Sequence, residues 1–105
     1  MIFIEIASFT EDLKGLLSDD EYRAFQQFLA AKPDIGDVIR GTGGVRKVRW
    51  AQAGRGKRGG VRVIYYWAAS AHQIRLLMIY PKSLKADLNK AEKAALKKIV
   101  EKGNG

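Results

Sequence analysis

The feature that most constrains the fold is the run at residues 76–80, which is apolar at every position. In a half-buried strand the side chains alternate between core and solvent, so apolar residues appear only at every second position. A run that is apolar throughout fits an interior strand with both faces covered. The sequence therefore predicts a sheet that holds this strand centrally and is covered, at least in part, on both sides.

Three further stretches predict strands because they are rich in β-branched and aromatic residues or alternate between polar and apolar residues. These stretches are residues 2–6, 45–51 and 61–69, and the apolar run extends to a fourth strand at 73–80. A short connection at 69–72 joins the last two strands, which predicts an antiparallel hairpin.

Capping residues mark two helices near the N-terminus. Thr10, followed by two acids, is expected to cap a short helix that ends near Leu17. Ser18 and Glu21 have the spacing of a capping box, and the helix that follows should end before Pro33. The apolar face of this second helix is predicted to pack in the core; it comprises Tyr22, Phe25, Phe28 and Leu29.

The last helix is predicted to start at a second pair of capping residues, Asn89 and Glu92, and to run to about Lys102. Its inner face is predicted to comprise Leu88, Ala91, Ala95, Leu96 and Ile99. The element order β-α-α-β-β-β-α implies an α+β fold, with the two N-terminal helices packed on a small, mostly antiparallel sheet.

The length of 105 residues allows one domain, so we expect residues 1–105 to form a single unit. The chain has no cysteine, which excludes disulfides and Cys-ligated zinc and fits a reducing compartment. Its apolar runs are too short to span a bilayer, and it opens with no signal peptide. We therefore expect a cytoplasmic protein without membrane contact.

The net charge of +8 is distributed unevenly along the chain. Residues 1–39 carry a charge of −5, residues 87–105 carry +2, and residues 40–86 hold eleven bases and no acid. A long acid-free segment of this kind is typical of proteins that bind polyanions, whereas a merely solvated surface usually includes acids. The charge pattern favours a nucleic acid partner.

Seven of the eleven glycines lie between positions 41 and 60, among many of these bases. Residues 41–44 resemble a phosphate-binding loop, but no Lys-Ser/Thr pair and no helix follow, so they predict a tight turn. The later glycine-rich segment carries Arg55, Lys57 and Arg58, whose side chains can bind a phosphate that the glycines allow to approach closely.

Alternation along residues 46–49 places Lys47 and Arg49 on one face of their strand and Arg46 on the other. If the three long strands are neighbours, Lys47, Arg49, Arg62 and Lys82 converge at one edge. The alternative is a set of separate bases that extend along a solvent-exposed face.

The acid-free segment offers no carboxylate for metal-dependent or paired-acid hydrolysis, and the only histidine, His72, lies in the predicted hairpin turn. A nuclease built on this segment would use neither metal nor cofactor. RNA would be cut by its own 2′-hydroxyl, with clustered cations stabilising the transition state and Lys or Arg side chains acting as base and acid.

Several stretches of the chain resemble the HigB branch of the RelE-like toxins, which belong to bacterial type II toxin–antitoxin pairs. They are GTGGVRKVR at 41–49, GKRGGVRVIYY at 56–66, IYPK at 79–82 with Asp87 and Leu88, SDDEY at 18–22 and GDVI at 36–39. The resemblance implies the α+β fold described above and a metal-independent endoribonuclease that cuts messenger RNA in the ribosomal A site.

The resemblance also implies roles for single residues. Lys47, Arg49, Arg62 and Lys82 match the cations at the family's catalytic site, and the predicted RNA-binding residues are Arg46, Arg55, Lys57, Arg58 and Lys85. Ser83 and Asn89 depart from the best-known RelE pattern, which has an arginine and a base-stacking tyrosine there. Trp50, Tyr65 or Tyr66 would have to stack on a base instead, although we expect at least two of them to pack in the core.

The implied partners are the ribosome with its message and a HigA-like helix-turn-helix antitoxin, through which the pair would bind operator DNA. A different class of protein shares the charge pattern: a nucleic-acid-binding module without catalysis, or a degenerate toxin kept as a co-repressor. Message cut in phase with codons distinguishes the enzyme from the module, which would bind RNA and leave it intact.

Overall fold

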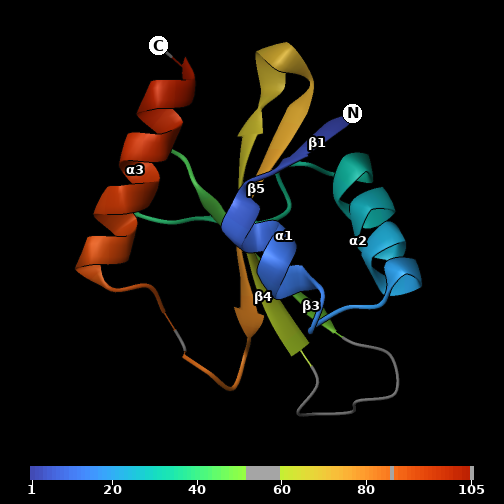
Figure 1. The fold of residues 1–105 in the computed structure, drawn as a ribbon. Coiled ribbons are helices and arrows are strands. Elements are labelled where there is room, and N and C mark those ends of the chain that lie inside the picture. The colour runs from blue at the N-terminus through green and yellow to red at the C-terminus, as the bar shows by residue number, and fades with distance from the viewer. Residues whose placement is uncertain (52–59, 86, 105) are drawn as a thin grey trace.

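The computed structural model describes residues 1–51, 60–85 and 87–104 (Figure 1). The elements in chain order are β1 (Ile2–Glu5), α1 (Ala7–Leu13), α2 (Asp19–Ala31), β2 (Asp37–Val38), β3 (Arg46–Ala51), β4 (Gly60–Ala68), a 3-10 turn (Ala69–Ala71), β5 (Gln73–Pro81) and α3 (Lys90–Asn104). Within those residues, no helix is both long enough and apolar enough to cross a membrane. The predicted α+β class is confirmed, with the short β2 as an additional strand.

The strands form one sheet in the order β1-β5-β4-β3-β2. The neighbours from β5 to β2 pair in antiparallel fashion, whereas β1 runs parallel to β5. The expected hairpin of β4 and β5 is present, and β5 is an interior strand as predicted, although β4 is the middle strand of the sheet.

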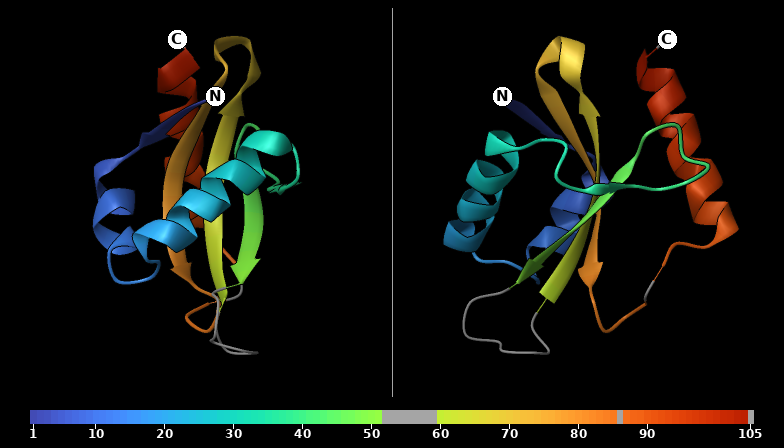
Figure 2. Two further views of the ribbon diagram at one scale, coloured as in Figure 1. Left: turned by 90° about the vertical axis from the view of Figure 1, so that its right-hand side faces the viewer. Right: turned by 180° about the vertical axis from the view of Figure 1, so that it is seen from behind.

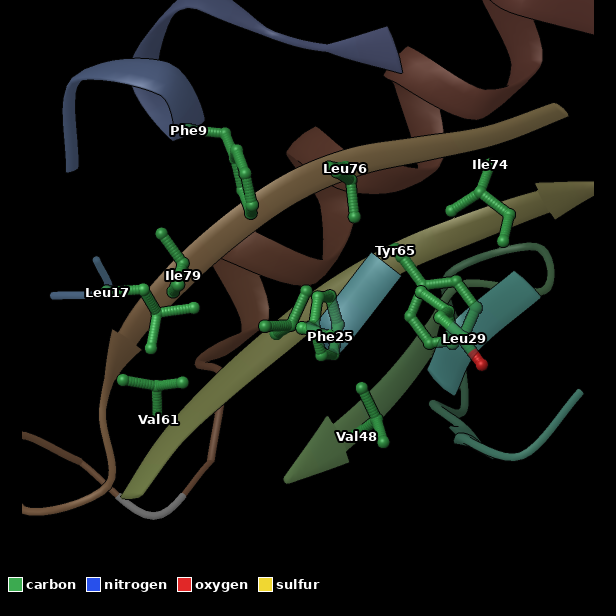
Figure 3. Close-up of a cluster of buried hydrophobic side chains, with 11 residues drawn as sticks. Phe9, Leu17, Phe25, Leu29, Val48, Val61, Tyr65, Ile74, Leu76 and Ile79 are labelled. Atoms are coloured by element: carbon green, nitrogen blue, oxygen red, sulfur yellow. The ribbon is translucent and has the colours of Figure 1, made fainter. Parts of the chain in front are cut away.

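Helices cover both faces of this sheet (Figure 2). Helices α1 and α2 lie on one face, where Phe9, Phe25 and Leu29 pack against strand side chains in the larger hydrophobic cluster (Figure 3). Helix α3 lies on the opposite face above a second cluster that includes Ile64 and Leu77. The apolar residues of β5 contribute to both clusters, which accounts for the uninterrupted run at 76–80.

The buried side of α3 differs in part from the predicted one. Leu88 and Leu96 are buried as predicted, and Val100 is buried with them. The other predicted inner residues are exposed: Ala91, Ala95 and Ile99. Leu96 and Val100 have the i, i+4 spacing of one helix face, and burying that pair removes more apolar area from water than burying alanines does.

Both predicted capping boxes are present. Ser18 and Glu21 exchange side-chain and backbone hydrogen bonds at the start of α2, and Asn89 and Glu92 do the same before α3. The prediction for Thr10 was wrong, because α1 begins at Ala7 and ends at Leu13. The Thr10 hydroxyl instead donates a 2.6 Å hydrogen bond to the Glu5 carboxylate at the end of β1.

The glycine-rich tetrad at 41–44 forms the predicted turn. Gly41, Gly43 and Gly44 all adopt positive φ angles, which glycine reaches without steric cost. The buried Thr42 hydroxyl closes the turn by donating to the Ile39 carbonyl (2.7 Å) and accepting from the Val45 N–H (3.1 Å). His72 lies exposed in the predicted turn between β4 and β5.

A partly buried network of hydrogen bonds attaches the segment after α2 to the sheet. The Tyr65 hydroxyl donates to the Pro33 carbonyl (2.7 Å) and accepts from the Gly36 N–H (2.9 Å). The Arg46 guanidinium donates to the carbonyls of Gly36 (2.7 Å) and Asp34 (3.0 Å). Because these groups lie between α2 and the sheet, the network fixes where the chain enters β2 and β3.

We predict that Gly36→Ala destabilises the protein by about 1–3 kcal/mol, the usual range for forcing extra volume into a packed site. A Cβ at this position would lie 2.8 Å from the Tyr65 ring and hydroxyl and 3.0 Å from the Lys47 carbonyl oxygen. Gly15→Ala is the matched control, since a Cβ there meets nothing within 4 Å. Urea unfolding of both variants measures the difference, and an equal midpoint for the two would contradict the prediction.

Candidate functional site

The register of the three long strands places three polar side chains in one row. Arg49 of β3 pairs with Arg62 of β4, and Arg62 pairs with Tyr80 of β5. Residues that pair across strands project from the same face, and Tyr80 belongs to the cluster under α3, so the row lies on the α3 side. Arg49 is exposed, whereas Arg62 is 6% and Tyr80 4% exposed, so the row leads from solvent into the protein.

Lys47 projects to the same face, two residues before Arg49 on β3. Its ammonium group lies 3.1 Å from the carboxylate of Asp87, in the segment that connects β5 to α3. The hydrogen bond and charge of Lys47 hold the pKa of Asp87 below its ordinary value, and the charges of Arg62 and Lys93 lower it further. The ion pair thereby places Lys47 beside the segment that precedes α3.

Lys85 and Glu92 form a second ion pair beside the row. The Lys85 ammonium also lies over the ring of Tyr80, 5.1 Å from its centroid. Glu92 accepts the Asn89 N–H at 3.0 Å, and these two hydrogen bonds, with Lys85 the larger influence, lower the pKa of Glu92. One carboxylate therefore both caps α3 and holds a cation above Tyr80.

The hydroxyl of Tyr80 is buried and has no hydrogen-bond partner among the residues that the structure describes. Burial raises the pKa of Tyr80, although the positive charges of Arg62 and Lys85 oppose that effect. Sequence reasoning assigned Tyr80 no role, since it ends an apolar run. Tyr80 is recognised as part of the site only from the strand register, which pairs it with Arg62.

Lys82 directly follows β5, and its backbone N–H donates to the carbonyl of Gly60 at 2.9 Å. Its side chain is exposed and lies 4.0 Å from where a Cβ on Gly60 would be. Lys82 is therefore at the end of the sheet where β4 begins, beside Gly60, which precedes Arg62 by two residues. The register thus places Arg49 beside Arg62, while Lys47 lies level with Ile64 and Met78 and Lys82 lies beyond Tyr80 in the other direction along the strands.

The structure describes two of the five predicted RNA-binding residues, and they lie on opposite faces of the sheet. Lys85 is at the site, but Arg46 lies on the opposite face, where its guanidinium serves the network after α2. Arg55, Lys57 and Arg58 lie outside the described residues.

The expectation that this site lacks carboxylates was wrong. Asp87 and Glu92 follow the acid-free segment in the sequence, and the connection to α3 brings both to the cations. Charge counted along the chain did not reveal these contacts, because they depend on where α3 packs. Each carboxylate is paired with a lysine, and no group of three or more His, Cys, Asp or Glu side chains suited to a metal ion occurs in the part of the chain that the structure describes.

The aromatic residues considered for base stacking lie mainly in the core. Trp50 contacts Phe25 and Phe28, with ring centroids 5.5 and 5.1 Å away, and Tyr65 is fully buried. This confirms the expectation that at least two of the three pack in the core. The guanidinium of Arg75 lies over the ring of Tyr66, with its Cζ atom 5.9 Å from the ring centroid.

The arrangement is suited to binding a phosphate. Guanidinium and ammonium groups form short, charge-assisted hydrogen bonds with phosphate oxygens, and partial burial strengthens them by excluding water. His72 is in the turn at the other end of β4 and β5, away from these residues (Figure 1). The polar side chains described at this site are therefore those of lysine, arginine and tyrosine, with Asp87 and Glu92 as counter-ions.

We predict that Lys47→Met raises the pKa of Asp87 toward the ordinary aspartate value, because it removes the hydrogen bond and charge that lower it. Side-chain carboxyl resonances followed by NMR during an acid titration measure the change. Lys97→Met is the control, since Lys97 pairs with Glu101 further along α3. An Asp87 titration unchanged by Lys47→Met would show that the ion pair does not form in solution.

Comparison with known proteins places this fold and site in context. Residues 15–104 match the family described as "RelE toxin of RelE / RelB toxin-antitoxin system". A structure of a doubly substituted E. coli RelE toxin in the free state is similar, with 12% identity, a TM-score of 0.57, and coverage of 80% of this chain and 85% of that one. The isolated E. coli RelE toxin is also similar, with 14% identity, a TM-score of 0.56, and coverage of 93% and 97%. Because the family match spans most of its length, this chain belongs to the RelE toxin family of toxin–antitoxin systems.

Proposed function

We propose that this toxin is a ribosome-dependent endoribonuclease of the HigB branch, which cleaves messenger RNA in the A site without a metal ion. The observation that carries the proposal is the row of Arg49 and Arg62, flanked by Lys47 and open to solvent at the Arg49 end. A strand of RNA offers phosphates to such a row, and each phosphate carries the charge that the cations attract.

In the proposed mechanism, Arg62 and Arg49 bind the scissile phosphate. Cleavage by the 2′-hydroxyl passes through a pentacoordinate phosphorus with additional negative charge on its oxygens. The two guanidinium groups come from paired residues of adjacent strands, so both can donate to oxygens of the same phosphate. They also hold the attacking oxygen, the phosphorus and the leaving oxygen in line.

Two proton transfers accompany this attack. A base removes the 2′-hydroxyl proton as the 2′-oxygen bonds to phosphorus, and an acid protonates the 5′-oxygen as its bond to phosphorus breaks. The products are a 2′,3′-cyclic phosphate and a 5′-hydroxyl. Lys47 and Lys82 are the candidate acid and base, one entering the reaction as an ammonium and the other as a neutral amine.

Binding of RNA and partners extends beyond these four residues. We propose that Lys85, together with Arg55, Lys57 and Arg58, binds message and ribosomal RNA in the cytoplasm. A HigA-like antitoxin with acidic side chains is the expected inhibitor, because it would neutralise the same cations, and operator DNA would be bound only through that complex.

We predict that Arg49→Ala lowers the rate of message cleavage by at least roughly 10²-fold, the effect of removing one donor that stabilises transition-state charge. Arg49 is exposed, so its loss should leave the fold intact. Arg23→Ala is the matched control, since this exposed arginine lies on α2, on the opposite side of the sheet. Cleavage of message on purified ribosomes gives the rates, and equal rates for both variants would contradict the site.

We also predict that induction without antitoxin arrests growth and cuts message in phase with codons. Primer extension on RNA from induced cells maps the cuts, which should disappear when translation is blocked. Intact message, combined with tight RNA binding that weakens with salt, would instead support the module without catalysis.

A further inference from the structure

The buried hydroxyl of Tyr80 is the feature of this site that the proposed mechanism leaves unexplained. Tyr80 is 4% exposed, and among the described residues its hydroxyl has no hydrogen-bond partner. Most buried polar side-chain atoms in folded proteins are hydrogen-bonded, and one that is not destabilises the fold. An unsatisfied buried group therefore needs an explanation, and a functional role is one such explanation.

The groups that act on this hydroxyl are charged: Arg62 and Lys85 are positive, and Glu92 and Asp87 are negative. Arg62 pairs with Tyr80 across the strands and is 6% exposed, and Lys85 extends over the Tyr80 ring. A tyrosine hydroxyl whose pKa is raised stays protonated and acts as a donor at neutral pH. Together with the charges of Arg62 and Lys85, this donor suits an anion with several acceptor oxygens.

Glu92 supplies one carboxylate to this group. It pairs with Lys85, and both side chains are about a quarter exposed, at 26% and 29%. The carboxylate also holds the start of α3 through the Asn89 N–H. The Lys85–Glu92 pair therefore covers the ring of Tyr80 from the side of the connection between β5 and α3.

We propose that Tyr80, Arg62 and Lys85 together bind one phosphate of the RNA backbone, and that the Lys85–Glu92 ion pair closes this site when RNA is absent. This inference deepens the proposed function. It rests on that function for one point, namely that the phosphate belongs to RNA. The phosphate replaces Glu92 as the counter-ion of Lys85, and one of its oxygens accepts the Tyr80 hydroxyl.

Tyr80→Phe tests the site by opposite effects on stability and binding. Removing a hydroxyl without a partner should leave the urea midpoint unchanged or higher, while weakening phosphate binding by about tenfold or more. Inorganic phosphate and a short 2′-O-methyl RNA, which cannot be cleaved, are the probes, with NMR shifts of the isolated protein as the readout. Tyr65→Phe is the matched control, because its hydroxyl has two partners on the other face.

For Tyr65→Phe we expect a lower urea midpoint and unchanged phosphate affinity of the folded protein. The inference would be overturned if inorganic phosphate leaves the wild-type resonances near Arg62 unshifted. It would equally be overturned if Tyr80→Phe binds phosphate as tightly as the wild type.

Glu92→Gln tests the closing contact. Glutamine can still accept the Asn89 N–H as a capping residue, but it no longer neutralises Lys85. We expect phosphate to bind roughly two- to fivefold more tightly, the scale of a partly exposed ion pair. Unchanged or weaker binding would show that Glu92 does not compete for Lys85.

These measurements distinguish the inference from the proposed function. If Tyr80→Phe weakens phosphate binding but the wild type leaves message intact on the ribosome, the phosphate site stands and the nuclease proposal fails. If the wild type cleaves message, and Tyr80→Phe cleaves message and binds phosphate as strongly as the wild type does, the nuclease proposal stands and this inference fails.

Discussion

Both the core and the candidate site depend on the pairing of β4 with β5, and in particular on an irregularity in that pairing. Ile64 pairs with Met78 while its neighbour Tyr65 pairs with Leu76, so β5 carries one additional residue, Leu77. An inserted residue reverses the direction of every later side chain in a strand. Beyond this bulge, the side chains of β5 therefore project to the faces opposite to those that strict alternation would assign.

The bulge determines which face carries Tyr80. Leu76 and Ile79 are an odd number of residues apart, yet both lie in the cluster under α1 and α2, and Leu77 and Tyr80 both lie in the cluster under α3. With strict alternation, Tyr80 would face α1 and α2, away from the two arginines. The sequence predicted an interior strand with two apolar faces, but no local pattern distinguishes a run with a bulge from a regular one. For this reason the sequence predicted the two arginines of the row as site residues but not the position of Tyr80 beside them.

Sequence reasoning succeeded where structure is determined by residues close in the chain. The capping boxes at Ser18 and Asn89 involve partners three residues apart, so their spacing was sufficient. It failed where the partner lies on another element, as at Thr10 of α1, whose hydroxyl bonds Glu5 of the preceding strand β1. The same limit explains Asp87: its lysine partner is forty residues away along the chain, on another element.

The two carboxylates also explain how a cluster of cations is compatible with a stable fold. Lysines and arginines held together repel one another, and part of that repulsion must be offset if the site is to be preformed without RNA. Asp87 is largely exposed, and solvent screens an exposed ion pair, so its hold on Lys47 is weak. A buried carboxylate would bind the lysine too firmly to be exchanged, because separating it would leave a charge unpaired away from water. Counter-charges at the solvent-exposed start of α3 therefore offset the repulsion and still allow a phosphate to replace them.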